Sequence, residues 1–269
     1  MSHPAPDLTG RTALVTGAAR GIGAAIAARL AAAGAHVVIA DLLAAEGRAT
    51  AHALSSRGHQ ALFVPLDVAD EWSWTEAVAT VVRETGGFDI LVNNAGVEVT
   101  SLIADLEVAA FRRLCEVNLM GPLLGLKSAF RAMRPGGAAG RGGAVVNISS
   151  TAAFTAYPAS GPYAAAKAGV ERLTKVAAVE AARLGYNVRV NCVYPGLVAT
   201  ELSQASAARA LEIGLFPDAD TLQAYFLSQI PLGRPGVPED VAEAVAFLAS
   251  DGARYITGVG LPVAGGLGL

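Results

Sequence analysis

The chain of 269 residues has only three lysines, two cysteines and no uninterrupted apolar run of the ~20 residues that a membrane-spanning helix needs. Its formal net charge is −3, and no segment is rich in Lys or Arg. This charge balance excludes the electrostatic pattern that is typical of nucleic-acid binders and of proteins on anionic membranes. Small molecules are therefore the expected partners.

Cysteine usage and the N-terminus both bear on the compartment. Cys115 and Cys192 lie too far apart in the sequence to indicate a disulfide framework, so we expect ordinary buried thiols in a reducing compartment. The N-terminal stretch MSHPAPDLTGR lacks a basic segment followed by an apolar one, so it predicts no secretory signal. A cytoplasmic location follows as a prediction.

Histidine is scarce as well. The four histidines all fall in the first quarter of the chain, at His3, His36, His52 and His59. They form no Cys/His cluster and no H-E-x-x-H pattern, so no transition-metal site is predicted. A serine hydrolase is excluded too, because it needs a G-x-S-x-G turn followed later by a histidine, and both are missing.

Short β-branched runs alternate with longer alanine-rich segments. The runs are TALVTG, AHVVIAD, ALFVPLDV, DILVNNAG, AVVNISS and NVRVNCVYPG. Buried parallel strands are continuous apolar runs of this length, and strand–helix alternation indicates right-handed βαβ units. The sequence predicts a doubly wound, Rossmann-like α/β sheet in one domain, residues 1–269.

Two segments interrupt this alternation. The glycine-rich residues 134–143 predict a flexible turn before the fifth strand. Residues 201–237 combine short helical patterns with Pro217, Pro231 and Pro235. We expect an insertion that covers the substrate there.

A glycine-rich turn follows the first strand, with Gly17, Gly21 and Gly23 in TGAARGIG. Glycine lets the backbone approach a pyrophosphate closely, and the following helix offers free N–H groups and a partial positive charge. Tight turns use glycines as well. The context favours dinucleotide binding, because a strand precedes the turn, a helix follows it, and the acidic Asp41 ends the second strand about 20 residues later.

Asp41 bears on the choice of cofactor. Its carboxylate can accept hydrogen bonds from both hydroxyls of an adenosine ribose, whereas it repels a 2′-phosphate, so NAD is favoured over NADP. Arg20 in the glycine turn can reach a phosphate, but Leu42 and Leu43 supply no second cation. The alternative role for Asp41 is a helix N-cap.

Two further strand ends carry polar residues. Asp67 and Val68 are expected at the end of the third strand, and Asn93 to Gly96 at the end of the fourth. Ligands of open α/β sheets bind outside these carboxyl ends, so Asp67 is expected near the adenine amine and NNAG along the cofactor. Ordinary turn chemistry is the alternative for both.

A tyrosine and a lysine stand four positions apart in GPYAAAKAGV. On a helix, Tyr163 and Lys167 would lie on one face, which predicts acid–base chemistry. A free phenol with a pKa of about 10 is too weakly ionised at neutral pH to act as a base, and a neighbouring ammonium favours the phenolate.

Several motifs in a fixed order carry a resemblance. They are TGxxxGxG from Thr16 to Gly23, NNAG at 93–96, Asn118, Ser150, Tyr163-x-x-x-Lys167 and the Pro195–Gly196 pair. With Ser150 thirteen residues before Tyr163, the chain resembles the short-chain dehydrogenase/reductase family over essentially its whole length. The C-terminal YITGVGLPVAGG is similar to the last strand of that family, which implies a parallel sheet of about seven strands.

The resemblance implies a catalytic tetrad of Asn118, Ser150, Tyr163 and Lys167 acting on a secondary alcohol or ketone beside a nicotinamide. Tyr163 would be the general acid or base, Lys167 would also bind the nicotinamide ribose, and Ser150 would hold the substrate oxygen. Asn118 would anchor a water that relays the proton. A homotetramer is implied as well, with the helix of Tyr163 packed against its copy, although Ala264 replaces the polar residue that often precedes the last two glycines.

The binding positions follow partly from the strand ends and partly from the resemblance. Cofactor contacts are expected at Gly17, Arg20, Gly21, Ile22, Gly23, Asp41, Asp67, Val68, Asn94, Ala95, Gly96, Tyr163, Lys167, Pro195, Gly196, Val198 and Thr200. Substrate contacts are expected at Glu98, Val99, Ser150, Phe154, Tyr157 and Leu197.

These substrate positions are mostly apolar, which predicts a hydrophobic or cyclic secondary alcohol, oxidised with NAD. Reduction of a 3-oxoacyl thioester with NADPH is an alternative that Asp41 opposes. A nucleotide-sensing binding protein without catalysis is the alternative from another class, and the intact tetrad argues against it.

Overall fold

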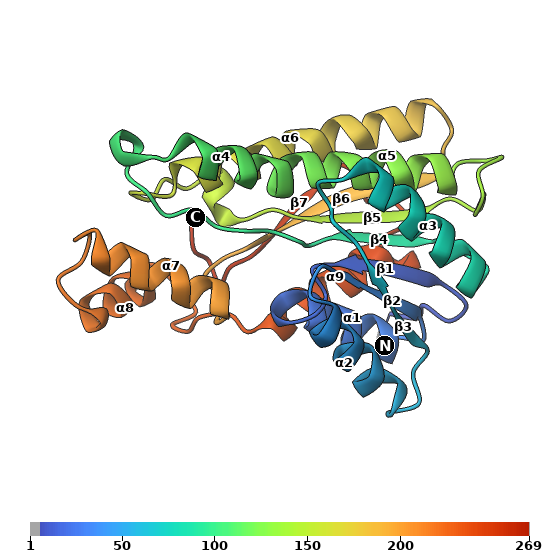
Figure 1. Ribbon diagram of the computed structural model, residues 1–269, viewed down its shortest axis with the longest axis horizontal. Helices are drawn as coiled ribbons and strands as arrows, with labels where there is room; N and C mark the ends of the chain where they lie inside the picture. Colours follow the sequence, from blue (N-terminus) through green and yellow to red (C-terminus); the bar gives the residue numbers. More distant parts are fainter. Residues whose placement is uncertain (1–5, 269) are drawn as a thin grey trace.

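The computed structural model describes residues 6–268, so the prediction for the N-terminal stretch lies partly outside the described residues. Seven parallel strands form one sheet in the order β3-β2-β1-β4-β5-β6-β7 (Figure 1). Their bounds are β1 Thr12–Thr16, β2 His36–Asp41, β3 Ala61–Pro65, β4 Ile90–Asn93, β5 Gly143–Ile148, β6 Val188–Pro195 and β7 Gly260–Val263. The predicted doubly wound sheet is confirmed.

Helices cover both faces of this sheet (Figure 1). One layer consists of α1 Gly21–Ala32, α2 Ala44–Ser55 and α9 Pro238–Ala249. The other consists of α3 Glu71–Thr85, α4 Val108–Cys115, α5 Gly121–Met133 and α6 Gly161–Arg183. Each layer buries its own apolar cluster against the sheet, which is why β1 and β4 are buried along their whole length and apolar at their central residues.

The third strand ends earlier than expected. It stops at Pro65, so Asp67 and Val68 lie in the turn that follows rather than in the strand. Pro65 has no N–H to donate to a neighbouring strand. It is tolerated here because β3 lies at the edge of the sheet.

Short elements and two separate helices complete the chain. The single-turn pieces are η1 Ile103–Asp105, the π-helical η2 Glu116–Met120, η3 Thr151–Ala153 and η4 Asp251–Ala253. Within the segment 201–237, α7 Glu201–Glu212 and α8 Ala219–Ser228 extend away from the two layers and bury no residue fully (Figure 1).

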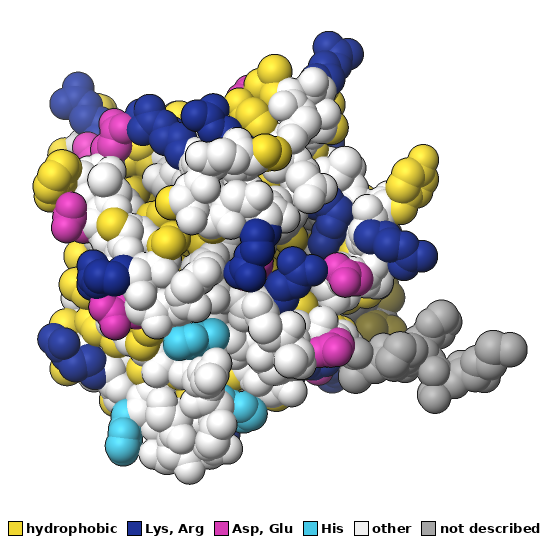
Figure 2. Space-filling view, turned by 90° about the vertical axis from the view of Figure 1, so that its right-hand side faces the viewer, with side chains coloured by type: hydrophobic (Ala, Val, Ile, Leu, Met, Phe, Trp, Pro, Cys, Tyr) yellow, Lys and Arg dark blue, Asp and Glu magenta, His cyan; other side chains and the backbone are white. Residues whose placement is uncertain are grey.

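The strand order reverses between β1 and β4, because β1 pairs with β2 on one side and with β4 on the other. Ligands of such sheets bind at this point, outside the carboxyl ends of the strands. At the end of the molecule opposite α7 and α8, basic side chains lie among acidic and apolar ones (Figure 2). None of the described helices is long and apolar enough to cross a membrane.

Candidate active site

The glycine turn between β1 and α1 depends on the absence of side chains. Gly17 and Gly21 have φ values of +63° and +58°, in the left-handed region. A Cβ on Gly23 would overlap the carbonyl oxygen of Gly17 and the amide of Asn94. The glycines therefore let β1, α1 and the end of β4 approach one another closely.

The start of α1 fits an anionic group. Its N-cap residue, Arg20, makes no side-chain cap, and the first turn holds no acidic residue. The first N–H groups of the helix and its partial positive charge are thus left for a ligand, as a dinucleotide pyrophosphate requires.

Asp41 ties the end of β2 to the glycine turn. One carboxylate oxygen accepts the N–H of Ala19 at 3.0 Å, and the other accepts the N–H of Leu43 at 3.0 Å. Leu43 occupies the N-cap position of α2, so Asp41 is not that N-cap. Each oxygen keeps a second lone pair, which leaves acceptor capacity for ribose hydroxyls.

Arg20 forms an ion pair across the cofactor side of the site. Its guanidinium lies 2.5 Å from the carboxylate of Glu201, the first residue of α7. Both side chains are exposed. The Arg20 guanidinium is therefore paired with a carboxylate from a distant part of the chain.

Asn94 holds the glycine turn from the side of β4. Its amide donates to the carbonyl oxygens of Thr16 and Gly17, both at 3.0 Å. The hydroxyl of Thr16 in turn accepts the N–H groups of Asn94 and Ala95, both at 3.0 Å. The NNAG turn and the glycine turn are thus one hydrogen-bonded unit.

Asp67 and Val68 have local structural partners. Asp67 accepts the N–H of Ala69 at 2.9 Å, which is turn chemistry. Val68 is buried against Gly121, and its carbonyl oxygen accepts the indole N–H of Trp74 at 3.0 Å. Their predicted cofactor contacts stay predictions.

Tyr163 and Lys167 lie one turn apart near the start of α6, with the Lys167 ammonium 5.5 Å from the centre of the Tyr163 ring. Lys167 is buried and donates to the carbonyl oxygen of Ile148 at 2.8 Å. Burial lowers the pKa of Lys167 to about 8, and the charge of Glu98 opposes this shift. For Tyr163, burial and then Glu98 raise the pKa, whereas a hydrogen bond with Ser150 lowers it.

The sequence pattern did not reveal what positions α6 against β5. The Ser149 hydroxyl donates to the Lys167 carbonyl oxygen at 2.8 Å. Deeper in the core, the Asn147 amide donates to Thr174 of the same helix at 2.9 Å. These buried hydrogen bonds fix the position of α6 along β5. Tyr163 therefore lies beside Ser150 at the carboxyl end of β5.

Asn118 lies in the π-helical turn between α4 and α5. Its side chain is fully buried, accepts the N–H of Val97 at 2.8 Å and donates to the carbonyl oxygen of Val97 at 2.7 Å. Such single π turns are frequent at functional sites.

The predicted substrate positions meet α7 and α8. Phe154 packs edge-on against Tyr194 at 5.2 Å between ring centres, and Tyr157 tilts against Phe226 of α8 at 5.9 Å. Glu98 accepts the hydroxyl of Ser206 on α7 at 2.7 Å. Leu197, after β6, is half-buried.

The segment after β6 leads from the sheet into α7. Gly196 packs against Ala264, and Val198 is buried and forms a parallel bridge with Gly236. Thr200 is the N-cap of α7 and accepts the N–H of Ser203 at 3.2 Å. The cofactor contacts expected for this segment stay predictions.

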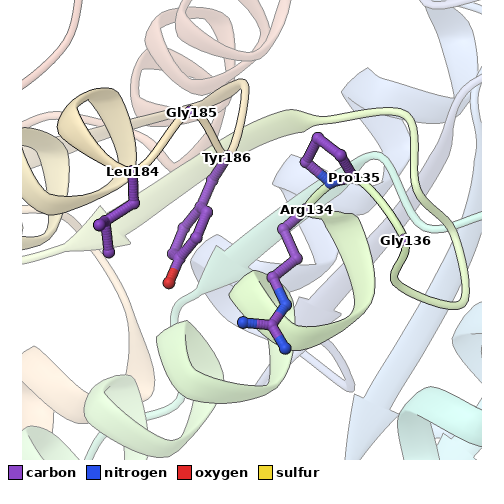
Figure 3. Close-up of a pocket in the computed structure, with 6 residues that line it drawn as sticks. All are labelled: Arg134, Pro135, Gly136, Leu184, Gly185 and Tyr186. Atoms are coloured by element: carbon purple, nitrogen blue, oxygen red, sulfur yellow. The ribbon is translucent and has the colours of Figure 1, made fainter.

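A separate surface hollow lies at the other end of the sheet (Figure 3). It is lined by the turn after α5 and the end of α6, where the Arg134 guanidinium lies 5.9 Å from the centre of the Tyr186 ring. These residues precede β5 and β6, whereas Ser150 and Tyr163 lie beyond the carboxyl end of β5. Among residues 6–268, no group of three or more His, Cys, Asp or Glu side chains is placed to hold a metal.

Comparison with known proteins identifies the family. A family model described as enoyl-(acyl carrier protein) reductase matches residues 17–268. Trans- and cis-4-hydroxycyclohexanecarboxylate dehydrogenases of Sinomonas cyclohexanicum are 41% and 45% identical, over 99% and 95% of this chain and 96% of each of theirs. A short-chain type dehydrogenase/reductase structure from Mycobacterium marinum is 32% identical with a TM-score of 0.86, covering 97% of this chain and 96% of that one.

The chain belongs to the short-chain dehydrogenase/reductase family. As a short-chain dehydrogenase/reductase it is an oxidoreductase that acts on CH–OH groups and interconverts an alcohol and a ketone. Members of the family that are dehydrogenases use NAD or NADP, and the substrate is a small molecule.

Proposed function

We propose that this enzyme oxidises a hydrophobic or cyclic secondary alcohol with NAD, with Tyr163 as the general base. The observation that carries the proposal is Asp41, whose carboxylate stands beside the glycine turn while Arg20 is paired with Glu201. A 2′-phosphate would meet a carboxylate there and no unpaired cation from the turn. NAD lacks that phosphate.

The chain's own side chains supply the proton chemistry. Tyr163 accepts the hydroxyl proton of the alcohol during oxidation and returns it during reduction. Ser150 holds the substrate oxygen next to the phenol of Tyr163. The positive charge of the Lys167 ammonium favours the phenolate form of Tyr163. Bound NAD supplies the hydride acceptor and a further positive charge. Asn118 fixes the backbone of Val97 through two hydrogen bonds.

The proposed substrate class rests on the aromatic side chains at the predicted substrate positions and on similarity to known dehydrogenases. Phe154, Tyr157 and Phe226 supply ring faces and edges suited to an apolar ring. The relatives from Sinomonas cyclohexanicum are named for cyclohexane-ring alcohols. Helices α7 and α8 would cover the bound substrate, because their residues meet the predicted substrate positions.

The test is a panel of cyclic, aromatic, steroidal and acyclic secondary alcohols, assayed with NAD and with NADP by the absorbance of reduced nicotinamide. We expect turnover of cyclic alcohols with a kcat/KM for NAD at least ~10-fold above that for NADP, as one like-charge contact would produce. Turnover restricted to NADPH and 3-oxoacyl thioesters would instead establish the biosynthetic reductase. Nucleotide binding without any turnover would indicate the non-catalytic sensor.

A further inference from the structure

Glu98 is an acidic residue that the tetrad chemistry does not use, yet it lies among the reacting groups. The preceding residue, Val97, is hydrogen-bonded through its backbone to Asn118, and a Cβ on Gly96 would lie 3.8 Å from the Lys167 Nζ, which places Glu98 in the same site. Its negative charge accordingly raises the pKa of both Tyr163 and Lys167. Burial raises the pKa of Glu98 itself, while the hydrogen bond from Ser206 and the charge of Lys167 lower it. Within residues 6–268, Glu98 has no salt bridge.

The Glu98 carboxylate can accept more hydrogen bonds than the described residues donate to it. One oxygen accepts the Ser206 hydroxyl at 2.7 Å, and Ser206 is itself 2.8 Å from the hydroxyl of Thr100. No described side chain or backbone group donates to the other oxygen. An ionised carboxylate accepts up to about four hydrogen bonds, and its partial burial is costly unless a ligand group supplies further donors.

Apart from the Lys167 ammonium, the segments around Glu98 carry little positive charge. Residues 94–107, 150–160 and 197–237, which contain the predicted substrate positions, hold two arginines and seven acidic residues. Arg209 pairs with Glu212 and Arg234 pairs with Asp240, and both arginines are exposed. Apart from the Lys167 ammonium, an anionic substrate would therefore meet net negative charge and no unpaired cation from these segments.

Resting on the proposed alcohol oxidation, we propose that Glu98 is a substrate-recognition residue that accepts a hydrogen bond from a second hydroxyl group of a neutral substrate. The preferred substrates are then cyclic diols, ahead of simple cyclic alcohols and ahead of hydroxy acids. Helix α7 contributes through Ser206, which holds the carboxylate in place.

The test compares cyclohexanediols, cyclohexanol and 4-hydroxycyclohexanecarboxylate as substrates of the full-length enzyme. The readout is the ratio of kcat/KM between two substrates, so that any change common to both cancels. In the wild type we expect the best diol to exceed cyclohexanol, and the carboxylate to fall below it, each by about 10-fold or more.

Two variants separate the hydrogen bond from the charge. Glu98→Leu removes the acceptor and is expected to lower the diol-to-cyclohexanol ratio about 10-fold, mainly through a higher KM for the diol. Glu98→Gln removes the charge and is expected to raise the carboxylate-to-cyclohexanol ratio. Glu107→Gln, an exposed acid on the same loop, is the matched control and should change neither ratio.

Three results would overturn the inference. They are a wild-type preference for the carboxylate over the diols, a diol ratio unchanged in Glu98→Leu, and equal effects of Glu98→Gln and Glu107→Gln. In each of these cases the alcohols still turn over, so the proposed function survives. Absence of turnover for every alcohol, with nucleotide still bound, would remove both the proposed function and the inference.

Discussion

The reactivity of Tyr163 depends on the charges around one phenol. Burial and the charge of Glu98 raise its pKa, and the hydrogen bond with Ser150 lowers it. Oxidation needs the deprotonated phenol, so kcat/KM for the alcohol should rise with pH through the apparent pKa of this group. Loss of a nearby negative charge favours the phenolate, so Glu98→Gln should move that rise to lower pH. Initial rates measured across the neutral and alkaline range give the pH at which kcat/KM rises. A shift of this rise to higher pH in Glu98→Gln would contradict the role of Glu98 beside Tyr163.

Cofactor choice is also decided at single residues. Leu42 follows Asp41 and is exposed, so an arginine is accommodated there. Asp41→Ser combined with Leu42→Arg should raise the NADP-to-NAD ratio of kcat/KM by about 100-fold, because a repulsive carboxylate is removed and a phosphate-binding cation is added. Leu42→Gln, which adds no charge, is the control. A ratio that stays constant in the double variant would show that Asp41 does not contact the ribose.

At the scale of elements, the approach of α1 to β1 and β4 depends on Gly23. A Cβ there would overlap the Gly17 carbonyl oxygen, and the backbone cannot move away without opening the turn. Gly23→Ala should therefore lower the free energy of unfolding by about 1–3 kcal/mol and weaken NADH binding. Urea unfolding and fluorescence titration measure the two effects. Ala28→Gly, farther along α1, should cost about 0.5–1 kcal/mol and leave NADH affinity intact.

The sheet was predictable from sequence because buried parallel strands are continuous apolar runs, and each predicted run contains a strand of the structure. Strand ends were less predictable. The apolar pattern of ALFVPLDV continues past Pro65, where the edge strand stops. The π turn at Asn118 was missed as well, because five residues are too few to reveal the shift that one extra residue makes in the helical periodicity.

The motif residues of the candidate site were predictable because their spacing along the chain is fixed by local turns and one helix. Contacts between distant segments were not. Arg20 and Glu201 are 181 residues apart, and Glu98 and Ser206 are 108 apart, so no periodicity or turn signal joins them. Ser149 was overlooked for another reason, since its hydroxyl acts on the backbone of Lys167 rather than on a ligand.

At the scale of the whole molecule, the outer face of α6 has an apolar surface. Val176 and Val179 are 54% and 53% exposed, and Leu123 on the neighbouring α5 is 49% exposed. This pattern supports the predicted homotetramer, in which α6 packs against its copy. Sedimentation equilibrium should give about four times the 27.2 kDa chain mass. The double variant Val176→Glu with Val179→Glu should lower the mass of the assembly, whereas Trp72→Glu on α3 should leave it unchanged. A wild-type monomer would refute the tetramer.

Tyr163 is expected to carry out NAD-linked oxidation of an alcohol. The decisive assay compares the wild type with Tyr163→Phe, using the best alcohol of the panel, NAD and the absorbance of reduced nicotinamide. NADH binding by each protein serves as the control for folding. We expect Tyr163→Phe to lower kcat by about 10²–10⁴-fold and to retain its affinity for NADH. Oxidation that continues at the wild-type rate in the Phe variant would contradict it.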